Sequence, residues 1–214
     1  MVAHVALLLG TSRLQIGAVG EIGLDDMTAK EEHFFEAQIQ LAIEHDLPIL
    51  IHTPHRDKKR GFERCLALVK ASGIAMDRVL IDHGNEETVK ITLDSGAMQG
   101  FSIYPNTKMS PARMVALLRE YGVERMIINS ACDWGVSDPL SVPKTVTLMS
   151  EAGFNHDDID TLVWKNPVGF FGRFGRGDET EWSQVPSLAW TDTFDGNSVL
   201  RGQSPDAMAK TDGR

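Results

Sequence analysis

Four side chains that can bind a metal ion lie in or just after apolar segments of this 214-residue chain: Glu21, His52, His83 and Asp133. Glu21 and His52 are 31 residues apart, and so are His52 and His83 (52 − 21 and 83 − 52), whereas Asp133 lies 50 residues beyond His83 (133 − 83). Two imidazoles and two carboxylates form a donor set used by divalent zinc, manganese and similar ions. The set predicts a divalent metal site, with zinc preferred over manganese or magnesium, and assigns to Asp133 the catalytic task of accepting a proton from a metal-activated water.

A second group of polar side chains follows His52 directly in LPILIHTPHRDK, residues 47–58. His55, Arg56 and Lys58 would lie near the mouth of such a site, where they can hold a phosphate or a carboxylate of the substrate. The alternative interpretation is a solvated, charged start of the next helix. The sequence favours neither interpretation.

Each candidate ligand also has an ordinary structural explanation. A single histidine at a strand end is more often a hydrogen-bonded structural residue than a ligand. Glu21 can cap the loop that follows it, and Asp133 can begin a turn with Gly135. The location of all four toward the C-terminal ends of predicted strands favours a shared site over four separate coincidences.

The elements that must position these residues alternate between short apolar runs and amphipathic segments. Alternation of strands and helices predicts a parallel sheet with right-handed crossovers. A (β/α)8 barrel of about 250 residues allots about 31 residues to each unit and collects its functional groups at the C-terminal ends of its strands. We therefore expect an α/β fold of the TIM-barrel type. The predicted strands are Ile16–Leu24, Pro48–His52, Arg78–His83, Met98–Tyr104 and Arg125–Ser130.

Local signals mark the ends of the helices between these strands. Thr28 and Glu31 have the T-x-x-E spacing of a capping box and predict a helix start. Gly73 predicts the end of the next helix. Ser110 before a proline predicts the start of a later helix, which ends at Gly122.

Composition narrows the class of protein. The net charge of −9 argues against a stable duplex nucleic-acid partner, which requires a basic face, although a local basic patch stays possible. The two cysteines, Cys65 and Cys132, have no metal-binding or disulfide-framework spacing, so a reducing compartment and a cytoplasmic location are expected. No run of about 18 apolar residues occurs, so no membrane span is predicted.

The periodic pattern ends at about Arg173. Glycine, proline and polar residues dominate beyond that point, which predicts a mostly disordered tail over residues 173–214 and a partial barrel domain over residues 1–172. Trp182, Trp190 and Phe194 leave open that part of the tail packs against the domain.

Six segments together resemble the TatD-like metal-dependent hydrolases of the amidohydrolase superfamily, and more narrowly their EboC-type branch. The resemblance implies a TIM barrel with a metal centre whose ligands are Glu21 from the fourth strand, His52 from the fifth, His83 from the sixth and Asp133 from the eighth. The segments are GEIGLD (20–25), LPILIHTPHRDK (47–58), VLIDHGNEET (79–88), GFSIYPNTKM (100–109), INSACDWGVSDPL (128–140) and WKNPVGFFG (164–172).

The family pattern also includes an H-x-H pair on the first strand, and this pair is absent. His4 has no partner two residues on, and only 17 residues (21 − 4) separate it from Glu21, whereas three strand–helix units need about 90. We therefore expect the chain to contain strands four to eight with their helices, as an N-terminally truncated form of a longer barrel.

The resemblance implies metal-dependent hydrolysis of an ester, amide or phosphodiester bond. Deoxyribonucleases among the TatD-like proteins make a phosphodiester plausible, while the acidic balance favours a small molecule or a short nucleic-acid end. The alternative is a non-catalytic, degenerate barrel that serves as a scaffold or half-site, because the H-x-H pair is missing. A metal-free α/β module that binds a sugar or a nucleotide is less favoured, since no G-x-G-x-x-G or Walker A pattern occurs. The sequence does not determine the oligomeric state.

Overall fold

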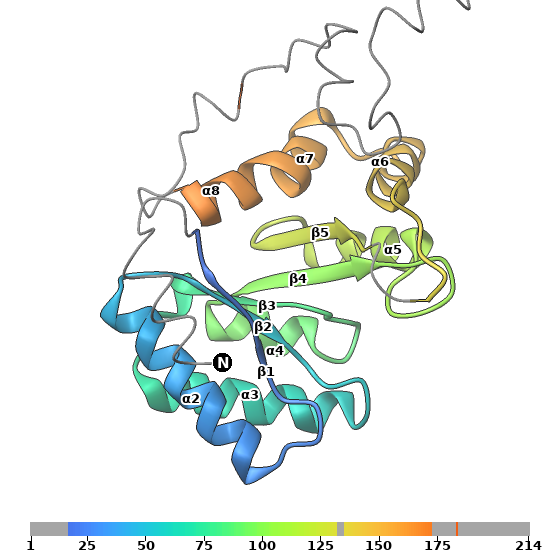
Figure 1. Cartoon of the computed structure of the whole chain (residues 1–214). Helices are drawn as coiled ribbons and strands as arrows, with labels where there is room; N and C mark the ends of the chain where they lie inside the picture. The colour runs from blue at the N-terminus through green and yellow to red at the C-terminus, as the bar shows by residue number, and fades with distance from the viewer. Residues whose placement is uncertain (1–16, 132–134, 173–182, 184–214) are drawn as a thin grey trace, which may run out of the picture. The chain divides into compact units, whose positions relative to one another are not determined.

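The protein, described here by a computed structural model for residues 17–131, 135–172 and Ser183, contains one parallel sheet of five strands (Figure 1). The strand order β1-β2-β3-β4-β5 follows the sequence order, and each neighbouring pair is parallel. This arrangement confirms the predicted series of strand–helix units. The strands are β1 (Val19–Gly23), β2 (Ile49–His52), β3 (Val79–Ile81), β4 (Met98–Ile103) and β5 (Met126–Ser130).

Helices connect the strands and also follow the last one. Figure 1 shows α2, α3 and α4 along one side of β1, β2 and β3, and α5 and α6 beside β4 and β5. The helices are α2 (Ala29–Glu44), α3 (Lys58–Ser72), α4 (Val89–Ser95), α5 (Pro111–Tyr121), α6 (Ser141–Glu151), α7 (His156–Asp160) and α8 (Asn166–Gly172), with a 3₁₀ turn η2 (Met76–Arg78) and a π-helical turn η3 (Thr161–Lys165).

All these elements belong to the first of two compact units, Met1–Asp178 and Glu179–Arg214. The predicted tail, residues 173–214, lies outside the described residues except for Ser183. Within the described ranges, no helix combines the length and the apolar character needed to cross a membrane.

The predicted helix ends are confirmed. Thr28 and Glu31 form the capping box at the start of α2, with reciprocal side-chain to backbone hydrogen bonds of 3.3 and 2.7 Å. Gly73 ends α3 in the left-handed region, at φ 78°. Ser110 caps α5, which ends at Gly122. Each side-chain cap stabilises its helix by about 1 kcal/mol, so local sequence fixes these boundaries.

The strands have two different faces. In β2, Ile49 and Ile51 are fully buried in the core shared with α2 and α3, whereas Leu50 and His52 line a cavity on the opposite face. The same alternation places Asp82, which directly follows β3, on the cavity face. Successive side chains of a strand point to opposite faces. Alternate residues of each strand therefore pack in the core, and the residues between them line the cavity.

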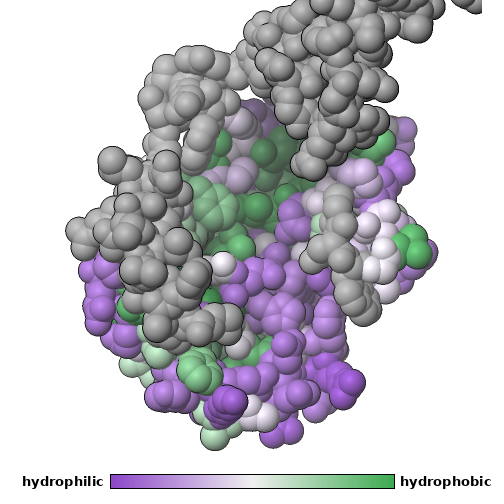
Figure 2. Space-filling model, viewed as in Figure 1, coloured by the Kyte–Doolittle hydropathy of each residue, from purple (hydrophilic) through white to green (hydrophobic). Residues whose placement is uncertain are grey.

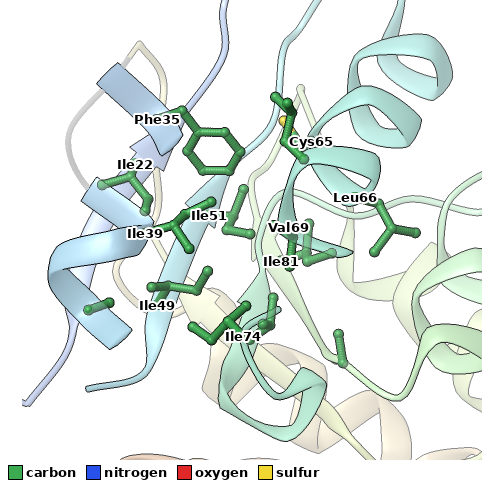
Figure 3. Packing of buried hydrophobic residues seen from close by; sticks show 14 of the residues in the cluster. Ile22, Phe35, Ile39, Ile49, Ile51, Cys65, Leu66, Val69, Ile74 and Ile81 are labelled. Carbon is green, nitrogen blue, oxygen red and sulfur yellow. The ribbon is translucent and has the colours of Figure 1, made fainter. Parts of the chain in front are cut away.

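The main core lies between β1–β3 and helices α2 and α3. Figure 3 shows Phe35 and Ile39 from α2 facing Ile51 of β2, with Cys65 and Val69 from α3 beside them. All five residues are at most 1% exposed. Full burial of such a large apolar side chain contributes about 1.5–3 kcal/mol, so this packing fixes the sheet on its helices.

Helix α8 packs on the cavity face of the sheet. Phe170 forms a buried cluster with Leu80 and Ile127, which come from β3 and β5. The Asn166 amide donates two hydrogen bonds of 2.8 Å, to the backbone carbonyls of Val123 and Met126, and so ties α8 to the N-terminal end of β5. Apolar side chains of β3, β5 and α8 therefore pack together on this face of the sheet.

We expect Phe35→Ala to lower the free energy of unfolding by about 3–5 kcal/mol, because it leaves a cavity in the core. Phe34→Ala is the matched control on the same helix, since the Phe34 side chain is 38% exposed. Its cost should stay at about 1 kcal/mol or less. Urea unfolding followed by circular dichroism measures both values, and equal losses would contradict this assignment of the core.

Candidate metal centre

Three predicted metal ligands meet at the C-terminal ends of neighbouring strands. Glu21 lies in β1, His52 ends β2 and His83 follows β3. One ligand atom from each lies within 4.8 Å of the others, an arrangement that can hold a metal ion. The fourth predicted ligand, Asp133, lies outside the described residues.

The equal spacing of 31 residues is not the register of the sheet. Residues of β2 pair with residues 30 positions later in β3 (79 − 49), so the residue in line with His52 is Asp82. Successive side chains of a regular strand point to opposite faces, but His83 has a φ of 60° and its ring lines the same cavity as the side chain of its neighbour Asp82. Glu21 lies within a register shift between β1 and β2. The three ligands therefore meet because of two local irregularities, which the regular spacing does not reveal.

A buried polar network surrounds His83. Its ring Nδ1 lies 2.7 Å from the Ser102 hydroxyl and its backbone N–H donates to Asp82 Oδ1 at 2.6 Å. Asp82 Oδ2 accepts from the Asn129 amide at 3.2 Å and from Ser102 at 3.4 Å. A side chain at Gly100 would put its Cβ 2.6 Å from Asp82 Oδ1, so glycine there leaves room for the carboxylate. The network fixes the orientation of the His83 ring.

Electrostatics favour a neutral His83. Burial, followed by the positive charge of Lys108, lowers the pKa of His83 to about 2. Burial also raises the pKa of Asp82, although hydrogen bonds from the His83 backbone and Asn129 act in the opposite direction. A neutral imidazole is the form that binds a metal, so His83 needs no deprotonation before it can act as a ligand.

His52 is oriented by a carboxylate outside the predicted set. Its Nε2 lies 2.9 Å from Asp25 Oδ1, and its ring centroid lies 5.0 Å from that of His83. A carboxylate partner commonly fixes the tautomer and the ring of a ligating histidine. Asp25 can therefore perform for His52 the orienting task that Ser102 performs for His83.

The cluster opens into a cavity of about 650 Å³. Figure 2 shows a hollow with hydrophobic residues in its depth and hydrophilic residues along its border. The lining residues are Glu21, Leu50, His52, His55, Leu80, Asp82, His83, Gly100, Ser102, Lys108, Ile127, Asn129, Ala131 and Phe171.

The three predicted substrate-binding residues occupy different places. His55 lines the cavity, and its ring stacks 6.4 Å from that of His83. Arg56 is exposed and is not among the described lining residues. Lys58 is the first residue of α3, and its ammonium donates to the Thr53 hydroxyl at 2.6 Å and to the Thr53 carbonyl at 3.2 Å. Lys58 therefore ties α3 to the end of β2.

Four residues without a predicted role line the cavity around His83, namely Asp82, Ser102, Lys108 and Asn129. Two signals were available. All four lie within the segments that carry the family resemblance, and alternation along β4 and β5 puts Ser102 and Asn129 on the cavity face. Strand alternation alone could not identify Lys108, which lies in the loop after β4.

Comparison with known proteins identifies the family. The model of the TatD related DNase family matches residues 3–172. The chain belongs to this family. The match covers the five strands and all the described helices, so the TatD-like assignment made from sequence motifs is confirmed, while the narrower EboC-type assignment stays a prediction.

Two curated relatives of the TatD-like chain are similar over most of its length. An uncharacterized metal-dependent hydrolase of Methanocaldococcus jannaschii is 30% identical over 154 residues, which are 72% of this chain and 61% of the relative. The phosphotriesterase homology protein of Escherichia coli is 26% identical over 80% of this chain and 64% of its own length. The chain therefore spans about three fifths of the length of these relatives.

Solved structures share the fold of the TatD-like chain. A TatD-like protein of Archaeoglobus fulgidus has a TM-score of 0.59 and 24% identity, over 73% of this chain and 60% of that one. The E. coli phosphotriesterase homology protein was solved with phosphate in its active site. It has a TM-score of 0.66 and 21% identity, over 79% of this chain and 67% of that one. These TIM-barrel neighbours and the parallel sheet confirm the predicted α/β fold class.

We expect Ser102→Ala to weaken Zn²⁺ binding roughly 10- to 100-fold, the effect typical of losing a hydrogen bond that orients a ligand. Competition with a chromophoric chelator measures the affinity. Ser150→Ala is the control, because the exposed Ser150 hydroxyl donates to a carbonyl of its own helix, Val146 O, at 3.1 Å. An unchanged affinity in Ser102→Ala would rule out an orienting role for this hydroxyl.

Lys58 should make folding stability depend on pH. Burial lowers the pKa of Lys58 from the ordinary 10.5 to about 8 in the folded chain. Between pH 8 and 10.5 the unfolded chain therefore binds more protons than the folded chain. The contribution of Lys58 to the free energy of unfolding then rises with pH. We expect the stability of Lys58→Met relative to wild type to fall by about 1–3 kcal/mol from pH 8 to 10.5. Urea unfolding at several pH values, with Lys59→Met as control, tests this, and a pH-independent difference would contradict it.

Proposed function

We propose that this chain is a metal-dependent hydrolase that holds a divalent ion, zinc by preference, with Glu21, His52, His83 and Asp133. The observation that supports it best is the cluster of Glu21, His52 and His83, whose ligand atoms lie within 4.8 Å of one another on a cavity wall. Membership of the TatD related DNase family and a relative named as a metal-dependent hydrolase support the same conclusion.

The donor set fits such an ion. One carboxylate and two imidazoles are borderline ligands suited to zinc and to manganese. The Nδ1 atom of His83 faces Ser102, while its Nε2 atom lies 3.4 Å from Glu21 Oε1 and so points into the cluster. Its neutral imidazole leaves the Nε2 lone pair available when the proton is on Nδ1.

In this proposal the bound ion supplies Lewis acidity, which makes water more acidic and polarises the bond under attack. Asp133 accepts a proton from the attacking water. His55 contacts the substrate from the cavity wall, while Ser102 and Asp82 hold His83 in place. Apolar side chains below the cluster, among them Leu80 and Ile127, exclude water and strengthen the charge interactions above them.

The proposed substrate carries an ester, amide or phosphodiester bond next to an anionic group. The E. coli relative was solved with phosphate in its active site, which supports a phosphate-containing substrate here. The net charge of −9 makes a small molecule or a short single-stranded end a better candidate than duplex nucleic acid. Arg56 and Lys58 stay predicted contacts for that anionic group.

Hydrolysis of 4-nitrophenyl acetate, 4-nitroacetanilide and bis(4-nitrophenyl) phosphate, with added Zn²⁺, Mn²⁺ or Mg²⁺, tests the proposal and distinguishes the bond types. We expect metal-dependent release of nitrophenol or nitroaniline from at least one substrate. Asp133→Ala should lower the rate about 10²- to 10⁴-fold, the usual contribution of a general base. His52→Ala and His83→Ala should lose metal binding and activity together.

His33→Ala provides a matched control for the histidine variants, because His33 is exposed on α2. Its activity and metal content should equal those of wild type. Equal rates in wild type, His52→Ala and Asp133→Ala would contradict the hydrolase proposal. That result, with a folded chain, would support the scaffold or half-site alternative.

A further inference from the structure

The loop after β4 brings a lysine to the wall of the cavity. Lys108 Nζ lies 3.3 Å from His83 Nδ1 and 5.0 Å from the centre of the Tyr104 ring. The side chain lines the cavity together with His55. Among the described residues, no carboxylate forms an ion pair with Lys108.

The backbone holds Lys108 in this place at some conformational cost. Its φ is 53°, in the left-handed region that a lysine seldom adopts. The Lys108 carbonyl accepts from Arg113 at 2.6 Å, and the same guanidinium binds both carboxylate oxygens of Glu86, at 2.8 and 2.6 Å. The next residue, Met109, bridges to Ile103 of β4. A strained conformation that several contacts enforce often marks a functional position.

The positive charge of Lys108 is unfavourable for a metal ion bound in the same cavity. Its charge lies beside a proposed metal ligand, and like charges repel, so the ammonium disfavours a cation at Glu21, His52 and His83. An anion in the cavity would be attracted by both positive charges and would offset their repulsion. Lys108 is therefore understandable as part of a site whose occupant is an anion.

Whether Lys108 can donate a hydrogen bond to His83 depends on which ring nitrogen of His83 carries the proton. A lysine ammonium only donates, so its 3.3 Å contact with His83 requires Nδ1 to be an acceptor. A histidine that offers Nε2 as a metal ligand keeps its proton on Nδ1, which then donates to the Ser102 hydroxyl 2.7 Å away. In that state His83 no longer accepts from Lys108, and the ammonium is available to a ligand in the cavity.

We propose that Lys108 binds an oxyanion group of the substrate, a phosphate or a carboxylate, beside the metal ligands. The proposal rests on the metal centre proposed above and adds to it the residue that selects the charge of the substrate. Lys108 has the better placement for this task than the other basic candidates, since Lys58 is bonded to Thr53 and Arg56 is outside the cavity lining.

Calorimetric titration of the Zn²⁺-loaded full chain with inorganic phosphate, and separately with acetate, tests this assignment. Lys108→Met removes the charge while keeping a flexible side chain of similar length. We expect phosphate or acetate to bind about 10- to 100-fold more weakly, the effect of one charge-assisted hydrogen bond. Lys108→Arg should recover most of the affinity. The anion with the larger loss identifies the group that Lys108 recognises.

Lys59→Met is the control, because Lys59 is an exposed lysine in the first turn of α3, paired with Glu63. It should bind both anions as wild type does. Equal anion affinities in wild type and Lys108→Met, or no anion binding by wild type, would overturn the assignment. The Zn²⁺ affinity of the wild-type chain is measured first. A wild-type chain that binds no Zn²⁺ contradicts the metal-centre proposal. In that case the same anion titrations of the metal-free proteins test the role of Lys108.

Discussion

The buried carboxylate of Asp82 joins the fold to the candidate site. Moving a carboxylate out of water is costly unless hydrogen bonds compensate it. Asp82 accepts these hydrogen bonds from the His83 backbone, from Ser102 of β4 and from Asn129 of β5. Three strands must therefore keep their register for one carboxylate to be satisfied. The same register sets the position of the His83 ring.

The space for Asp82 is provided by its neighbours. Gly100 lies opposite, where any side chain would collide with the carboxylate. The Thr53 hydroxyl donates to the Asp82 backbone carbonyl at 2.9 Å and accepts a hydrogen bond from the Lys58 ammonium. Through these contacts the end of β2, the start of α3 and the end of β3 form one polar assembly. A change in any of them would be transmitted to the ligands.

One face of the sheet packs in the hydrophobic core, and the other face carries the candidate site. On the outer face of β1–β3, isoleucine and valine side chains pack against α2 and α3. On the inner face, Leu80 and Ile127 pack with Phe170, and polar side chains occupy only the C-terminal ends of the strands. Charged and polar groups are thus concentrated at one end of an otherwise apolar surface. An electrostatic interaction there is stronger than it would be in open water.

The sequence by itself determined the strand–helix alternation, the helix ends at Thr28, Gly73 and Ser110, and the identity of Glu21, His52 and His83 as candidate ligands. These are local properties, since capping, periodicity and residue type act within a few positions. The three candidate ligands lie close together although the register offset between β2 and β3 is 30 residues and not 31.

Only the tertiary structure decided which side chains surround those ligands. The positive φ of His83 and the register shift beside Glu21 bring both side chains to the cavity, and neither is encoded by spacing. Ser102, Asn129 and Lys108 come from strands and a loop that lie 19 to 46 residues beyond His83 (102 − 83 and 129 − 83). Their roles follow from parallel pairing of distant segments, and pairing energies depend on the whole sheet rather than on the residues adjacent in the chain.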